Sequence, residues 1–245
     1  MIKFCGNKQN SLFVSTVICM IVGIITRELY LLENIVPVRD SYKYFDFISE
    51  WNSFSQSISI GKYPPLALFI LKIPSSYFSY DIINGSILVN NVLGIAIIML
   101  ITIITYQLTK NNWITISIGL IFGTHPTLVK YSCEAIRENT YILFLCLSIW
   151  GLLAHIKRKK TLYLLLTSFF TCCGTLCRHE GLEAFVTILI ILLAFENNKS
   201  FIKRFVNICV YSAGYVLSFF VVIRSIGIPF TYFYGYQYIL ESLSI

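Results

Sequence analysis

The sequence predicts an all-α, polytopic integral membrane protein with about seven transmembrane helices. Of its 245 residues, 56% are hydrophobic and only 13% are charged, whereas soluble domains carry about 25% charged residues. The chain is also long enough for about seven spans of about 20 residues each, together with their connectors. These observations exclude an ordinary soluble protein, and we expect residues 1–245 to form a single transmembrane domain.

Apolar stretches suitable for membrane spans occur repeatedly along the chain. They comprise residues 11–26, 85–108, 113–124, 140–156, 161–177, 182–195 and 205–223. No signal-peptide cleavage site follows the first stretch, so we expect it to be an uncleaved anchor. The stretches 113–124 and 182–195 are short. To cross, they need flanking residues, local thinning of the bilayer or shelter from a neighbouring helix.

Basic residues are distributed unevenly between the connectors. If the N-terminus is inside and each stretch crosses once, ten basic residues and one acid fall inside, against nine basic and eleven acidic residues outside. Connectors 157–160 and 199–204 carry most of this excess, and short basic loops favour the cytoplasmic side. We therefore predict a plasma or inner membrane protein with a cytoplasmic N-terminus. The same asymmetry accounts for the net charge of +7 without a nucleic-acid partner.

The first external segment, residues 27–84, is too long for a connector and too apolar for a soluble domain. Its helical periodicity predicts an amphipathic helix that rests in the membrane interface. The apolar side carries Tyr44, Phe47, Ile48, Trp51 and Phe54, and the polar side carries Lys43, Asp46, Glu50 and Ser53. Pro64 and Pro65 suit a turn or a helix start. The apolar run after them is expected to end at Pro74, too short to span the membrane.

Ionisable residues next to the predicted spans gather on the external side. They are Arg39 and Asp40 after the first span, Glu134, Arg137 and Glu138 after the third, Arg178, His179 and Glu180 after the fifth, and Arg224 after the seventh. Charges at membrane depth are costly and are usually paired or functional. The spacing of Glu134, Arg137 and Glu138 predicts one shared helix face. Two interpretations are open. Either these residues line a wet cavity that binds a charged substrate, or they form a solvated helix end with a local ion pair.

The arginines and the aspartate among these residues suit phosphate binding and proton transfer. Arg178 and Arg224 border apolar spans, and a guanidinium binds phosphate through bidentate, permanently charged contacts. For Arg178, snorkelling to the interface is the alternative. Asp40 is placed to accept a proton from an attacking hydroxyl, or to cap a helix that begins there. These two roles of Asp40 are compatible.

Three motifs follow one another along the external segments. Arg39-Asp40-Ser41-Tyr42 and Tyr63-Pro64-Pro65-Leu66 flank the amphipathic helix. His125-Pro126-Thr127-Leu128 leads on to Glu138-Asn139-Thr140-Tyr141, and Arg178-His179-Glu180-Gly181-Leu182 follows. In this order they resemble the first external loop, the connection between the third and fourth spans, and the Arg-x-Glu-Gly-Leu stretch of the C-type glycosyltransferases. Those membrane enzymes are similar to protein O-mannosyltransferases and the lipid A aminoarabinose transferase. The resemblance covers about residues 11–195.

The resemblance implies transfer of a hexosyl or pentosyl group from a polyprenyl-phosphate donor, on the external side, to a glycolipid, polymer or protein. Asp40 matches the general base of the family's first loop. Residues expected to bind the donor phosphate or substrate are Arg39, Arg137, Glu138, Arg178, Glu180 and Arg224, with Glu134, Tyr63 and His125 as further candidates. Family members often carry two consecutive acids in this loop, whereas Ser41 follows Asp40 here. The chain is also shorter than usual for the family, so a truncated, non-catalytic paralogue is an alternative.

A second alternative is a transporter or flippase for a lipid-linked saccharide. A transporter presents polar groups at the bilayer midplane with access from both sides. Here the mid-span polar groups, Asn90, Asn91 and Asn207, are modest and the charges gather on one side, which favours an enzyme. The sequence contains no metal-ligand cluster, and no cofactor is expected. A divalent cation on the donor phosphate stays open.

Overall fold

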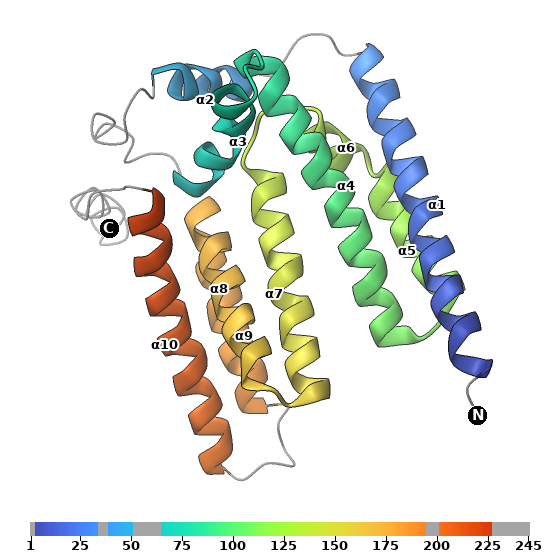
Figure 1. Ribbon diagram of the computed structural model, residues 1–245, viewed down its shortest axis with the longest axis vertical. Helices are drawn as coiled ribbons and strands as arrows, with labels where there is room; N and C mark the ends of the chain where they lie inside the picture. The colour runs from blue at the N-terminus through green and yellow to red at the C-terminus, as the bar shows by residue number, and fades with distance from the viewer. Residues whose placement is uncertain (1–2, 34–38, 51–64, 195–200, 227–245) are drawn as a thin grey trace, which may run out of the picture.

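The fold is all-α, as predicted. The computed structural model describes residues 3–33, 39–50, 65–194 and 201–226, and these ranges contain ten helices and no strand (Figure 1). The helices are α1 (Lys3–Glu33), α2 (Arg39–Glu50), α3 (Pro65–Tyr77), α4 (Ile82–Thr109), α5 (Asn112–Thr124), α6 (Pro126–Ser132), α7 (Glu138–Arg158), α8 (Thr161–Cys177), α9 (Gly181–Ala194) and α10 (Phe201–Ile226). Each predicted apolar stretch coincides with one of them, and α2, α3 and α6 are additional.

Four helices in the described part of the chain are long and apolar enough to cross a membrane, namely α1, α4, α7 and α10. The other three predicted spans are shorter, because α5, α8 and α9 contain 13, 17 and 14 residues. A helix of 14 residues rises about 21 Å, less than the hydrocarbon core of about 30 Å. A crossing by these three helices therefore stays a prediction.

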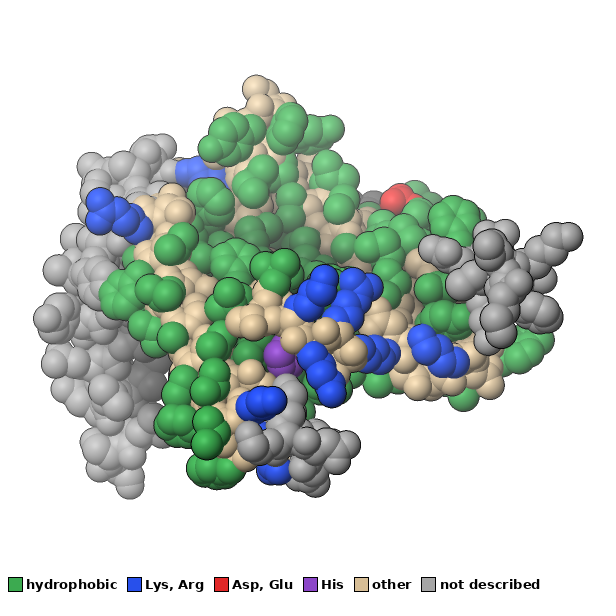
Figure 2. Space-filling view, turned by 60° about the horizontal axis from the view of Figure 1, so that its bottom comes forward, with side chains coloured by type: hydrophobic (Ala, Val, Ile, Leu, Met, Phe, Trp, Pro, Cys, Tyr) green, Lys and Arg blue, Asp and Glu red, His purple; other side chains and the backbone are tan. Residues whose placement is uncertain are grey.

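The helices that match the seven predicted spans run in alternating directions along the chain, so alternate connectors meet at the same end of the bundle (Figure 1). One end, which we call the loop end, carries α2, α3, α6 and the turn 178–180. The other, the basic end, carries Lys110, Lys157–Lys160, Lys203 and Arg204. Figure 2 brings the basic end forward and shows Lys and Arg side chains gathered on it. The fold thus separates the basic connectors from the candidate-site segments.

Small residues allow α1 and α5 to approach each other closely, as in many membrane helix pairs. A Cβ at Gly119 of α5 would lie 2.6 Å from the Sγ atom of Cys19 in α1. At the next turn, the carbonyl of Gly123 accepts hydrogen bonds from Thr26 Oγ1 at 2.9 Å and Arg27 Nη1 at 3.2 Å. The Arg27 side chain is 1% exposed. Backbone carbonyls exposed by the glycines therefore solvate a buried guanidinium.

Helix α2 is amphipathic as predicted, but protein covers its apolar face. Tyr44 and Ile48 are buried against Leu68 and Leu71 of α3 and against Ile136. The prediction that this face rests in the membrane interface is therefore wrong for these two side chains. The Phe47 side chain and residues Trp51 and Phe54 lie outside the described part.

Helix α3 begins at Pro65, as the double proline predicted, but it does not end at Pro74. The helix continues to Tyr77, with Pro74 buried inside it. A proline in a helix interior removes one backbone hydrogen bond. Burial of the Pro74 ring against α4 offsets part of the free energy that this lost hydrogen bond costs. A Cβ at Gly85 of α4 would lie 3.0 Å from Pro74 Cβ. Pro74 therefore serves as a packing surface rather than as a terminator.

The contact between α4 and α6 depends on the absence of a side chain at Gly94. A Cβ there would lie 2.1 Å from Ser132 Oγ and 3.0 Å from Arg27 Nε, both buried. By contrast, the nearest atom to a Cβ at Gly174, in α8, would lie 3.7 Å away. The two glycines thus differ in packing, although both lie inside helices.

We expect Gly94→Ala to lower the free energy of unfolding by about 1–3 kcal/mol, because overpacking forces helices apart. Gly174→Ala, the matched control, should be neutral or slightly stabilising, because alanine favours helix more than glycine does. Thermal unfolding of both variants in the same detergent measures the difference. Equal melting temperatures would contradict the packing assigned to Gly94.

Candidate functional site

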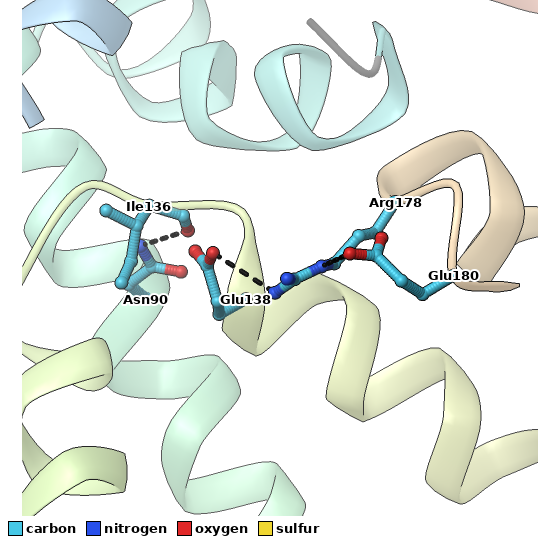
Figure 3. Close-up of polar contacts among 5 residues, drawn as sticks. All are labelled: Asn90, Ile136, Glu138, Arg178 and Glu180. Carbon is cyan, nitrogen blue, oxygen red and sulfur yellow. Dashed lines mark hydrogen bonds and ion pairs between the residues drawn. The ribbon is translucent and has the colours of Figure 1, made fainter. Parts of the chain in front are cut away.

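The turn between α8 and α9 places Arg178 between two carboxylates. Its Nη1 donates a hydrogen bond to Glu138 Oε1 at 3.3 Å, and its Nε lies 2.9 Å from Glu180 Oε1 as an ion pair (Figure 3). The three side chains are partly exposed, with Arg178 at 30%. A guanidinium carries five N–H donors, and among the described residues Glu138 and Glu180 engage only Nη1 and Nε. The pair therefore fixes the guanidinium while leaving donors for a ligand.

A sharp turn produces this arrangement. Helix α8 ends at Cys177, and the N–H of Arg178 still donates to Gly174 O at 2.9 Å while its backbone is already extended. Gly181 then packs directly on the end of α8, where a Cβ would lie 2.4 Å from the backbone nitrogen of Thr175. Only glycine fits such a close backbone approach. The close approach of the backbone of α8 thus explains why the Arg-x-Glu-Gly-Leu motif has a glycine at this position.

Charges around the turn set its protonation states. Desolvation alone would lower the pKa of Arg178, but Glu180 and Glu138 outweigh it and hold that pKa above its ordinary value. Desolvation would raise the pKa of Glu180, yet a backbone hydrogen bond and the Arg178 guanidinium hold it below its ordinary value. Desolvation and the charge of Arg137 lower the pKa of His179. The turn therefore presents an ionised carboxylate, a guanidinium and a neutral imidazole at neutral pH.

Loop 133–137, which connects α6 to α7, leads directly into Glu138, the other half of the ion pair. Glu138 is the first residue of α7, whereas Glu134 lies in the loop itself. The prediction that Glu134, Arg137 and Glu138 share a helix face is therefore wrong. The helix that would align them is interrupted between Cys133 and Arg137. Glu134 is only 5% exposed and Arg137 is half-buried.

Buried amides hold this loop. Asn90 of α4 donates from Nδ2 to the carbonyls of Glu134 and Ile136, the latter at 2.9 Å. Asn139 Nδ2 donates to the Asn90 carbonyl at 3.1 Å and to Ser132 Oγ at 3.0 Å. Figure 3 shows Asn90 and Ile136 on one side of Glu138 and Arg178 on the other. Asn90 thus belongs to the support of the site and is not an isolated mid-span polar group.

The loop also supports α2, whose first turn contains Asp40. The Ile136 side chain lies in the cluster that buries Tyr44 and Ile48. Helix α2 begins at Arg39, so Asp40 lies in its first turn and not at the cap predicted for it. Carboxylates are also favourable in a first turn. The side chains of Arg39 and Asp40 lie outside the described part.

The remaining predicted site residues lie apart from the Arg178 ion pairs or outside the described residues. Arg224 is exposed in the last turn of α10, and no hydrogen bond or ion pair joins it to any other described residue of the site. His125 is exposed between α5 and α6 and forms no side-chain cap. Tyr63 lies outside the described residues. The structure therefore brings together Glu138, Arg178 and Glu180, with Arg137 close enough to affect the pKa of Glu180.

An apolar groove of about 750 Å³ begins beside this cluster, between α7 and α9. Tyr141 and Glu183 line it near the loop end, and Ile156 and Leu108 line it near the basic end. The other lining residues are mostly aliphatic. The groove therefore runs along the bundle from a polar mouth into an apolar interior, which suits a molecule with a polar head and a long hydrocarbon chain.

Sequence reasoning missed four residues of this region. Asn139 and Tyr141 belong to a motif that was recognised, but their roles depend on contacts with α4 and α9. Asn90 looked like an ordinary polar residue in a span, since the loop carbonyls that it binds are 44 and 46 positions away. Glu183 follows the Arg-x-Glu-Gly-Leu motif directly, and its position three residues after Glu180 could have signalled a shared helix end.

Comparison with known proteins identifies the family. The family model for dolichyl-phosphate-mannose-protein mannosyltransferase matches residues 62–225, more than half of the chain. The match contains Arg137, Glu138, Arg178 and Glu180, while Arg39 and Asp40 precede it. Comparisons with curated proteins and with solved structures found no match. Together with the apolar helices, the match confirms the resemblance drawn from the motifs: this integral membrane protein belongs to the dolichyl-phosphate-mannose-protein mannosyltransferase family of C-type membrane glycosyltransferases.

Proposed function

We propose that this protein transfers a sugar from a polyprenyl-phosphate donor to an acceptor on the external side of the membrane. The observation that carries the proposal is the Arg178 guanidinium, held by Glu138 and Glu180. An apolar groove begins close by, because Tyr141, which lines it, donates a hydrogen bond to the Glu180 carbonyl at 3.5 Å. A guanidinium with donors to spare suits a phosphate. The neighbouring groove suits the hydrocarbon chain to which that phosphate is attached.

The reaction requires a base and a stabilised leaving group. The acceptor hydroxyl oxygen forms a bond to the anomeric carbon, the bond from that carbon to the phosphate oxygen breaks, and polyprenyl phosphate leaves. Negative charge develops on the phosphate as it departs, and Arg178 stabilises that charge, with Arg137 adding a second positive charge nearby. Asp40 takes the proton from the acceptor. Support for this last role is the packing of α2 on Ile136, in the loop that leads into Glu138.

The charge distribution supports the proposed side of the membrane. Lys110, Lys157–Lys160, Lys203 and Arg204 at the basic end favour the cytoplasm. The loop end then faces outward, which gives the donor phosphate a position at the external leaflet. Arg39, Arg224, Glu134, Tyr63 and His125 belong to segments at this end of the bundle or next to it in sequence, and they remain candidates for contacts with the sugar or the acceptor.

Asp40→Asn should reduce sugar transfer by about 100- to 10,000-fold, because an amide of the same shape cannot accept the proton. The measurement is release of labelled polyprenyl phosphate from donors carrying hexoses or pentoses, in membranes that contain the protein. Asp46→Asn is the matched control, since Asp46 is exposed on the same helix. Full turnover by Asp40→Asn would remove Asp40 as the base. Movement of labelled donor between leaflets without polyprenyl phosphate release would instead identify a transporter.

Arg178→Ala should raise the KM for donor by about 10- to 100-fold, the loss expected for hydrogen bonds to a charged group. Arg178→Lys should recover only part of it, because an ammonium lacks the planar fork. Arg158→Ala, at the exposed basic end, is the control and should behave like the unaltered protein. A donor KM unchanged in Arg178→Ala would return Arg178 to a snorkelling or purely structural role.

A further inference from the structure

Loop 133–137 joins the two halves of the proposed site. It ends at Arg137, one residue before the Glu138 that pairs with Arg178, and its Ile136 side chain packs under the helix that carries Asp40. A shift of this loop would therefore move the phosphate-binding half and the base-carrying half relative to each other. What fixes the loop also fixes their separation.

The loop has few bonds of its own. Between Cys133 and Glu138 it forms no helix, and its one internal backbone hydrogen bond runs from the Ile136 N–H to Glu134 O at 3.1 Å. The Glu134 carbonyl also accepts a hydrogen bond from the Asn90 amide, and the Ile136 carbonyl accepts a second one from the same amide. Because both partners are acceptors, only the NH2 end of the amide can satisfy them. Asn90 is 0% exposed, so solvent does not reach its side-chain amide.

The backbone of Asn90 is held by a second set of hydrogen bonds. The backbone carbonyl of Asn90 accepts a hydrogen bond from Asn139 Nδ2, which also donates to Ser132 Oγ. Ser132 in turn packs against Gly94, which lies on α4 with Asn90. The polar chain therefore runs from α6 through α7 to α4 and back to the loop. Unpaired carbonyls in a membrane protein are costly. The hydrogen bonds of Ser132, Asn139 and Asn90 therefore favour a single conformation of the loop.

We propose that Asn90 is a positioning residue, which sets the distance between Glu138 and Arg178 by holding loop 133–137 through its side-chain amide. It does not contact the reacting groups. The inference deepens the proposed function, on which its catalytic meaning rests, but its geometry can be tested without any activity. Neighbouring Asn91 is a natural control. It lies on the same helix and is 8% exposed, and its Oδ1 accepts no hydrogen bond from any described residue.

The test measures proximity. Glu138→Cys and Arg178→Cys are combined in a background without the native cysteines, and a short bis-thiol reagent reports the cross-linking rate of the folded protein in membranes. Asn90→Ala and Asn90→Asp should each slow cross-linking by roughly tenfold, the shift expected from losing two hydrogen bonds of ordinary strength. Asn91→Ala should leave the rate unchanged. If Asn90→Ala does not accumulate, Asn90→Ser, which keeps one donor, is measured in its place.

Two results would overturn the inference. One is a lower melting temperature for the Asn90 variants with an unchanged cross-linking rate, which would make Asn90 a residue of general stability only. The other is an equal loss in Asn91→Ala, which would assign the effect to α4 packing as a whole. Failure of the proposed function is a separate outcome, since it would appear as a lack of sugar transfer by the unaltered protein while the cross-linking result stood.

Discussion

The hydrogen bonds from Asn90 to loop 133–137 are the constraint on which the site most depends. They fix a segment that has lost its helical hydrogen bonds, and they do so from a buried side chain that solvent does not reach. Glu138 reaches Arg178 from the end of this loop, and α2 rests on its Ile136 side chain. The site is therefore assembled by long-range contacts among α2, α4, α6, α7 and the α8–α9 turn.

Membrane packing explains how such a site tolerates buried charge. Arg27 is buried between α1 and α5, where glycines expose carbonyls to its guanidinium. The environment of Arg178 is different, because its side chain is partly exposed and two carboxylates balance its charge. One arginine joins helices and the other remains accessible to a ligand. The sequence alone does not separate these roles, since both residues lie next to apolar stretches.

Composition and hydrophobic periodicity predicted the all-α fold, the positions of the apolar helices and the separation of basic connectors from acidic ones. Each of these follows from local sequence. The helix interruption at 133–137, the burial of the α2 face under α3 and the continuation of α3 through Pro74 do not, because tertiary contacts decide them. Motifs likewise predicted Arg178, Glu138 and Glu180, but not Asn90, whose partners are distant in sequence.

The most direct test of the account is the side of the membrane from which the loop end is accessible. Asp40→Cys, Arg178→Cys and Arg224→Cys are made singly in a cysteine-free background, with Lys110→Cys and Lys159→Cys as references at the basic end. An impermeant maleimide applied to intact cells should label the first three, and the two references only after permeabilisation. If Asp40→Cys and Arg178→Cys label from opposite sides, one catalytic site cannot contain both residues, and the proposed mechanism is wrong.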